Sequence, residues 1–316
     1  MGLFAKPVGA AVSDGAKERI AMLQAYPTLD TWRNPLTRGL ARRLANDTWM
    51  KTHEELDFDF RLTDVEIGDV PCTRYETAQT RPNGDLILYL HGGGFLAGSP
   101  RANASMILPA CELSGLEAIG VDYSLVPEAR YPVALDEVDA VYRSLVEDNP
   151  NRRIIMFSDS MGCVLNLVCQ QRWRADGVPM PAASVFISPI LDGKGGSDTH
   201  ITLDAFDPLL TSKGGRDVRK LFQFYAPDAD LADPRISPIY GDFTGLPPML
   251  IHVGTRDVCL GDSARLAEKM RLNRRHATLR VFDGMFHLFH MHWSIEETKN
   301  AFQDIAAFIG EVQRAP

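Results

Sequence analysis

The chain has 316 residues, of which 45% are hydrophobic and 23% are charged, and its formal net charge is −8 at pH 7. This is the composition of an ordinary soluble globular protein, and the length suffices for one large hydrophobic core. The acidic balance argues against a nucleic-acid partner, because phosphate binding needs a concentrated basic surface. The basic pairs in this chain are short and scattered.

The cysteines and the first residues bear on the compartment. Five cysteines form no CxxC pair and no metal-ligand spacing, which favours reduced thiols and gives no support to a metal site. Lys6 and Pro7 interrupt the start of the chain, which therefore lacks the apolar stretch of a signal peptide. No run approaches the roughly 18 apolar residues of a membrane span. We expect a cytoplasmic protein without a membrane span.

The first 54 residues are predicted to form two helices around Pro27 and Pro35, with no strand of their own. A hairpin is expected next, because Phe58–Ile67 alternates acidic and apolar side chains and Pro71–Thr77 does so less clearly. Runs rich in branched apolar residues then predict strands at Leu86–Leu90, Ala118–Tyr123, Ile154–Phe157, Ala183–Ser188, Met249–Val253 and Thr278–Phe282.

Segments with helical spacing lie between these runs, at Met106–Leu113, Ala134–Leu145, Cys163–Arg174, Asp262–Leu272 and Thr298–Val312. Alternating strands and helices predict an α/β fold with a mostly parallel sheet of about eight strands and helices on both faces. Residues 191–242 break the alternation, being rich in Gly, Asp and Pro with one convincing helix, Gly215–Tyr225. We interpret residues 1–54 as cap helices, 55–316 as the main domain, and about 191–242 as a cap insertion above the sheet.

A sharp turn, Ser158-Asp159-Ser160-Met161-Gly162, follows the predicted strand Ile154–Phe157. A serine on a tight turn between a strand and a helix is exposed at the top of the sheet, provided that small residues stand two positions before and after it. Gly162 meets that need and Ser158 meets it less well, so the usual GxSxG appears as SxSxG. The turn alone also fits a serine that only caps a helix.

A glycine-rich loop, His91-Gly92-Gly93-Gly94-Phe95, follows the predicted strand Leu86–Leu90. It has neither the GxGxxG spacing nor the Walker lysine of a phosphate-binding loop. Its backbone N–H groups suit an oxyanion instead, and we expect Gly93, Gly94 and Met161 to donate to one. The loop and Ser160 together predict acyl transfer through serine.

At these motifs the chain resembles the hormone-sensitive lipase family of esterases, which have the α/β-hydrolase fold. The similarity covers roughly residues 55–312, and the segments that also carry it are Val121–Glu128 with its YxLxPE pattern, Tyr131–Ala134, Ile187–Pro189, Ser237–Pro238 and Gly245–Pro248. It implies that Gly93 and Gly94 are oxyanion donors and that His91 anchors their loop by hydrogen bonds. The chain departs from the family at Ser158, Met161 and Cys163, and we expect these departures to mark what is unusual about its substrate.

The acid that serves a serine in this fold lies after it in the chain, ahead of the histidine. Asp257 follows the predicted strand Met249–Val253 across a short turn and matches the family's acid. Asp262 is interpreted as the N-cap of the next helix. Asp207 and Asp283 have plausible structural roles, so Asp257 is our predicted acid.

The base is predicted among the histidines that follow Ser160. His287, His290 and His292 cluster after the last predicted strand, and His287 is nearest the strand end and matches the family's histidine. The other histidines after Ser160 have different expected places: His200 lies in the insertion, His252 in an apolar strand and His276 in an exposed turn. The predicted triad is Ser160, Asp257 and His287.

These residues predict hydrolysis of carboxylic esters with short to medium acyl groups, through an acyl-enzyme on Ser160 and without a cofactor. Apolar candidates for the pocket wall are Phe95, Phe206, Met285 and Phe286, together with Met161. A non-catalytic receptor for small ligands and an acyltransferase stay open as alternatives, and a lactone or carbamate would suit the same residues. The resemblance also implies a homodimer through the last strand and the C-terminal helix, Thr278–Phe282 and Thr298–Val312.

Overall fold

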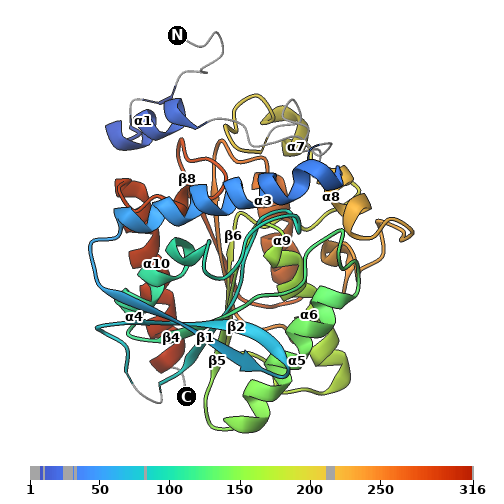
Figure 1. Cartoon of the computed structure of the whole chain (residues 1–316). Helices are drawn as coiled ribbons and strands as arrows, with labels where there is room; N and C mark the ends of the chain where they lie inside the picture. Colours follow the sequence, from blue (N-terminus) through green and yellow to red (C-terminus); the bar gives the residue numbers. More distant parts are fainter. Residues whose placement is uncertain are drawn as a thin grey trace.

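The computed structural model describes residues 8–9, 11–23, 31, 34–81, 84–210 and 218–314. At its centre lies an eight-stranded sheet in the order β1-β2-β4-β3-β5-β6-β7-β8 (Figure 1). The strands are β1 Phe60–Ile67, β2 Val70–Thr77, β3 Leu86–Leu90, β4 Glu117–Val121, β5 Ile154–Asp159, β6 Ala183–Ile187, β7 Met249–Gly254 and β8 Ala277–Phe282. β2 pairs antiparallel with β1 and β4, and the other neighbours are parallel. The predicted α/β fold is confirmed.

Helices cover both faces of this sheet because the central strands are apolar on both sides. Every residue of β3 and β5 is buried. Ile87, Tyr89 and Phe157 share one core with α4 (Leu108–Ser114) and α10 (Glu296–Arg314). The opposite face packs against three helices, α5 Val133–Asp148, α6 Gly162–Asp176 and α9 Leu260–Leu272.

Strand register brings the predicted motifs to one edge of the sheet. β3 and β5 run parallel with Leu90 opposite Ser158, so the glycine loop and the serine turn leave the sheet side by side. β7 and β8 are likewise parallel, with Gly254 opposite Phe282. Because the carboxyl ends of parallel strands meet at a common edge, the segments that carry Asp257 and His287 emerge there too.

Elements from the two predicted cap segments lie over this edge. In the described part of the first 54 residues, α1 (Asp14–Met22) and α3 (Pro35–Met50) are helical. Proline is favoured in the first turn of a helix because the N–H that it lacks would be unpaired there, which explains why α3 begins at Pro35. Pro27 lies outside the described residues. In Figure 1, α3 runs across one end of the sheet, on the same side as α7 (Thr199–Thr202) and α8 (Val218–Tyr225).

The remaining elements are short. The predicted helix Gly215–Tyr225 is seen as α8 from Val218 onward, and residues 215–217 lie outside the described part of the chain. Single 3-10 turns are η1 Lys51–Glu55, η2 Ala104–Met106, η4 Pro238–Tyr240 and η5 Phe289–Met291. Of the helices that the structure describes, none is long and apolar enough to cross a bilayer.

Candidate active site

Ser160 lies on a strained turn between β5 and α6. Its φ angle is +50°, in the left-handed region that non-glycine residues rarely adopt, and its N–H donates to the carbonyl of Ile187 at 3.0 Å. The turn is tight: a Cβ at Gly162 would collide with the carbonyl oxygen of Leu90. The backbone therefore presents the Ser160 hydroxyl at the end of the strand, as the sequence pattern predicts.

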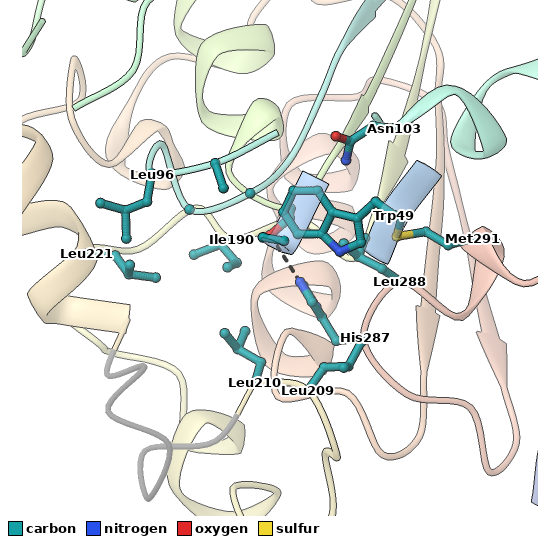
Figure 2. Close-up of a pocket in the computed structure, with 15 residues that line it drawn as sticks. Trp49, Leu96, Asn103, Ile190, Leu209, Leu210, Leu221, His287, Leu288 and Met291 are labelled. Carbon is teal, nitrogen blue, oxygen red and sulfur yellow. Dashed lines mark hydrogen bonds between the residues drawn. The ribbon is translucent and has the colours of Figure 1, made fainter. Parts of the chain in front are cut away.

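The predicted acid and base lie in line with this hydroxyl. His287 Nε2 is 3.0 Å from Ser160 Oγ (Figure 2), and His287 Nδ1 is 3.1 Å from Asp257 Oδ1. The Cys259 N–H donates to the same Asp257 oxygen at 2.9 Å and holds it in place. This is the geometry in which a histidine can take the proton of a serine while a carboxylate orients the imidazole.

The electrostatics of the pair favour a charged imidazole. Burial lowers the pKa of His287, but Asp257, through its charge and hydrogen bond, and the charges of Asp207 and Asp159 together raise it more, so that the net shift is upward. Burial raises the pKa of Asp257, while His287 and the hydrogen bonds from Ser188 and Cys259 together lower it more and leave the carboxyl ionised. A buried base whose protonated form is stabilised by a carboxylate suits general acid–base catalysis.

A second buried carboxylate stands close to this pair. Asp207 accepts backbone hydrogen bonds from Leu209 and Leu210 at 2.9 and 3.1 Å. Burial and the neighbouring charge of Asp257 raise its pKa to about 7. Asp207 caps the segment that carries Leu209 and Leu210, and where it is ionised its charge raises the pKa of His287.

The other candidate acids and bases lie elsewhere. Asp262 is not the N-cap of α9 as predicted, because the helix begins at Leu260; its buried carboxylate instead accepts the Leu191 N–H at 2.8 Å. His290 contacts His252 at 3.3 Å, and His292 lies 3.6 Å from Glu55. Neither histidine faces Ser160.

Two of the predicted oxyanion donors line the cavity with Ser160, and the third, Met161, follows Ser160 in the chain. Gly93 and Gly94 line the pocket beside Ser160 and have φ angles of +115° and +70°, which are accessible to glycine at little cost. Among the hydrogen bonds of the described residues, the backbone N–H groups of Gly93, Gly94 and Met161 donate to no protein acceptor. Free N–H groups next to a nucleophile are what an oxyanion hole requires.

His91 and Asp159 fix the glycine loop. His91 is buried and stacks on Tyr123 at 4.3 Å between ring centroids, and the Tyr123 hydroxyl donates to the His91 carbonyl at 2.5 Å. Asp159 accepts from the Gly92 N–H at 2.9 Å and from the Tyr89 hydroxyl at 2.6 Å. Asp159 thus ties the loop to the serine turn. The sequence pattern alone does not predict this role of Asp159, and the only signal for it is the position next to Ser160.

A cavity of about 100 Å³ opens onto Ser160, and its walls are mainly apolar. Its main side chains come from α3, the glycine loop, the cap insertion with α8, and η5: Trp49, Leu96, Leu209, Leu210, Leu221 and Met291 (Figure 2). The predicted wall is wrong, because Phe95, Phe206, Met285 and Phe286 are absent from this lining. Phe95 instead stacks on Tyr225, while Met285 and Phe286 are buried in a separate core with α1 residues.

The residues at which the chain departs from the family pattern are buried next to the site and do not line the cavity. The Ser158 hydroxyl contacts Cys163 Sγ at 3.4 Å and accepts from Asn166 Nδ2 at 2.8 Å, all within the buried core. Neither Ser158, Met161 nor Cys163 lines the cavity. The side chains of these residues are therefore not expected to contact the substrate, and Ser158 and Cys163 pack against each other.

A metal ion is the competing interpretation of part of this cluster. The ligand atoms of Asp257, Cys259 and His287 lie within 4.8 Å of one another. However, Asp257 Oδ1 and His287 Nδ1 are already paired with each other at 3.1 Å. A metal would have to replace that hydrogen bond, so the observed contacts favour a triad.

Comparisons with known proteins agree with this geometry. Residues 87–291 match the family model of the alpha/beta hydrolase fold. The chain is 34% identical to an acetyl-hydrolase from Streptomyces hygroscopicus, over 78% of this chain and 83% of the relative. It is 33% identical to an esterase from Acinetobacter venetianus, over 71% and 74%.

Solved structures extend the similarity over almost the whole chain. The crystal structure of an esterase from the bacterial hormone-sensitive lipase family superposes with a TM-score of 0.84 and 27% identity, covering 96% of this chain and 99% of that one. A hormone-sensitive lipase from a metagenome library gives a TM-score of 0.81 and 28% identity, covering 94% and 98%. The chain therefore belongs to the α/β-hydrolase family, among the esterases of the hormone-sensitive lipase type.

Proposed function

We propose that this esterase hydrolyses carboxylic esters through a Ser160–His287–Asp257 triad and an acyl-enzyme. One observation carries the proposal. Hydrogen bonds of 3.1 and 3.0 Å join Asp257 to His287 and His287 to the Ser160 hydroxyl, and this hydroxyl lies beside backbone N–H groups that have no acceptor among the described residues. A serine hydroxyl is a weak nucleophile without such a base. No step needs a metal or a cofactor.

In the first half of the reaction, His287 Nε2 takes the Ser160 proton as Oγ attacks the acyl carbon. The negative charge moves to the carbonyl oxygen, where Gly93, Gly94 and Met161 donate hydrogen bonds, and Asp257 stabilises the imidazolium. The C–O bond to the alcohol then breaks, and His287 returns its proton to the leaving oxygen. In the second half, water takes the place of the alcohol and releases the acid and Ser160.

The substrates are proposed to be esters with short to medium acyl groups. A cavity of about 100 Å³ with leucine walls holds a few carbon atoms of an acyl chain rather than a long one. The name of the Streptomyces relative, an acetyl-hydrolase, agrees with a short acyl group. The walls contributed by α3 and α8 support the proposal that residues 1–54 and about 191–242 form a cap over the pocket.

The test is Ser160→Ala assayed with p-nitrophenyl butyrate. Loss of one oxyanion donor alone costs about 10²–10³ in rate, whereas loss of the nucleophile should leave almost no activity. Ser158→Ala is the matched control, because this buried serine lies two residues away and does not line the cavity. Activity of Ser160→Ala close to that of the parent would refute the triad. Preferential transfer of the acyl group to added alcohol would instead identify an acyltransferase.

We also propose a homodimer and a cytoplasmic location. β8 is an edge strand, and Val281 on it is 46% exposed, so a second copy could pair there next to α10. Light scattering after size exclusion of the parent and of Val281→Lys tests the dimer: an unchanged dimer in the variant, or a monomeric parent, would contradict it.

The five cysteines are free and buried, which suits a reducing compartment and supports the proposed cytoplasmic location.

A further inference from the structure

Asn103 stands out in the pocket wall. It follows the glycine loop, directly before η2, and its side chain is buried at 1% exposure. Among the described residues that line the cavity, the only other side chains with polar atoms are Ser160, His287 and Trp49. Ser160 and His287 serve the proposed reaction, so the Asn103 amide is a polar group in an apolar wall that the mechanism does not use.

The hydrogen bonds of Asn103 fix which way its amide faces. The Ser99 N–H donates to Asn103 Oδ1 at 3.3 Å, and the Asn103 N–H donates to the Ser99 carbonyl at 3.0 Å. Because a backbone N–H can only donate, the side-chain atom facing Ser99 must be the oxygen. The amide nitrogen therefore faces away from Ser99, and Figure 2 shows it on the side of Trp49 and the cavity.

The amide N–H groups of Asn103 have no hydrogen-bond partner among the described residues. The side chain accepts one hydrogen bond, from the Ser99 N–H, and donates none there. The amide borders the cavity, and most polar groups of buried side chains in native structures are paired with protein, water or ligand. The donor is thus available to a bound molecule.

The cavity has two unlike sides. In Figure 2, Leu96 and Leu221 lie on one side of the Ser160–His287 hydrogen bond, and Asn103, Trp49 and Met291 lie on the other. An ester has two substituents, the acyl chain and the alcohol, which extend in different directions from the reacting carbon. A substituent that extends toward Leu96 and Leu221 would meet aliphatic side chains, and one that extends to the other side would meet the amide of Asn103.

We propose that Asn103 determines specificity by donating a hydrogen bond to a second oxygen of the substrate, so that the enzyme prefers esters with an ether, keto or hydroxyl oxygen in one substituent. The proposal rests on ester hydrolysis at Ser160. The reacting carbonyl oxygen has its own donors in Gly93, Gly94 and Met161, which leaves Asn103 for another acceptor.

The test compares esters that differ only in one oxygen. For the acyl side, p-nitrophenyl 3-methoxypropanoate is paired with p-nitrophenyl pentanoate; for the alcohol side, 2-methoxyethyl butyrate is paired with butyl butyrate. The readout is the ratio of kcat/KM within each pair, so that differences in intrinsic reactivity cancel between enzyme variants. Loss of a neutral hydrogen bond in Asn103→Leu should lower this ratio about 3- to 10-fold in one pair.

Asn46→Leu is the matched control. Asn46 Oδ1 accepts from the Gly98 N–H at 3.0 Å, so the same substitution there disturbs the same loop without removing a group from the lining. Its ratios should equal those of the parent. If Asn103→Leu does not fold, Asn103→Ser keeps an oxygen near Ser99 and withdraws the amide from the cavity.

Each outcome supports or overturns the proposed role of Asn103. A lowered ratio in one pair supports the proposal and identifies the substituent that Asn103 contacts. Ratios unchanged in both pairs overturn it, including the case in which all four esters become equally slower, because Asn103 would then act on the reacting carbonyl or on the fold. If the folded parent hydrolyses none of the four esters, the proposed function itself fails.

Discussion

Asp257→Asn tests the electrostatic part of the triad without removing its geometry. The Cys259 N–H and His287 Nδ1 both face Asp257 Oδ1, at 2.9 and 3.1 Å. The amide oxygen of asparagine should therefore take the Oδ1 position and still accept the proton of His287 Nδ1. The substitution then keeps the imidazole tautomer and removes the negative charge.

The negative charge of Asp257 should stabilise protonated His287 by several kcal/mol. At the 3.1 Å separation of Nδ1 and Oδ1, and with an effective dielectric constant of about 20, the attraction between unit charges is about 5 kcal/mol. This attraction exists only once His287 is protonated, so it acts in the transition state. Its complete loss corresponds to about 10⁴-fold in kcat/KM, and the remaining amide dipole makes about 10³-fold a realistic lower bound.

The assay is kcat/KM for p-nitrophenyl butyrate as a function of pH. Asp257 raises the pKa of His287, so its neutralisation should lower that pKa and move the acid limb of the profile to lower pH. Asp262→Asn is the control, because this buried aspartate on the same segment contacts Leu191 and not His287. A loss below tenfold in Asp257→Asn, with the acid limb in place, would refute the assignment.

Three further predictions concern the parent protein, the pocket and the turn. The kcat/KM of the parent should fall on the acid side through a pKa above 6.5, because the net shift of His287 is upward; a limb below that pH would contradict the geometry. Leu221→Ala should lengthen the acyl chain at which activity in a p-nitrophenyl ester series falls, since Leu221 lines the cavity; an unchanged limit would place the acyl group elsewhere. Gly162→Ala should destabilise the fold by about 1–3 kcal/mol through a clash with the Leu90 carbonyl, seen as a lower melting temperature in circular dichroism; an unchanged melting temperature would show that the turn can relax.

The strands and their succession along the chain were predictable because they depend on local pattern, and the predicted ends agree with the observed ones to within about two residues. Apolar runs such as Leu86–Leu90 are buried on both faces, which only a strand covered by helices on both sides permits. Once the sheet is parallel, its topology brings the loops after β3, β5, β7 and β8 together. The positions predicted for Ser160, Asp257 and His287 follow from that constraint, and their distances agree with it.

The pocket was not predictable in the same way. Its wall depends on which side chains of distant segments meet, and an apolar residue looks the same in the sequence whether it faces a cavity or a core. Phe95 is adjacent to the glycine loop in sequence, but its ring turns away to stack on Tyr225. Trp49 lies on α3, far before Ser160 in the chain, and Leu221 lies on α8, far after it. Which face of these helices meets the cavity cannot be told from the pattern alone.

The contacts of α3 link this pocket to the catalytic machinery. Arg42 on α3 donates to the carbonyl of Leu96 at 2.8 Å and to that of Val126 at 3.0 Å, and Asn46 accepts from Gly98. These bonds hold the far side of the glycine loop, whose near side is held by Asp159. The helix that supplies Trp49 to the pocket thus also positions the loop of the proposed oxyanion donors. A change in α3 that widens the pocket should therefore also loosen oxyanion stabilisation, so that substrate range and turnover are coupled in this fold.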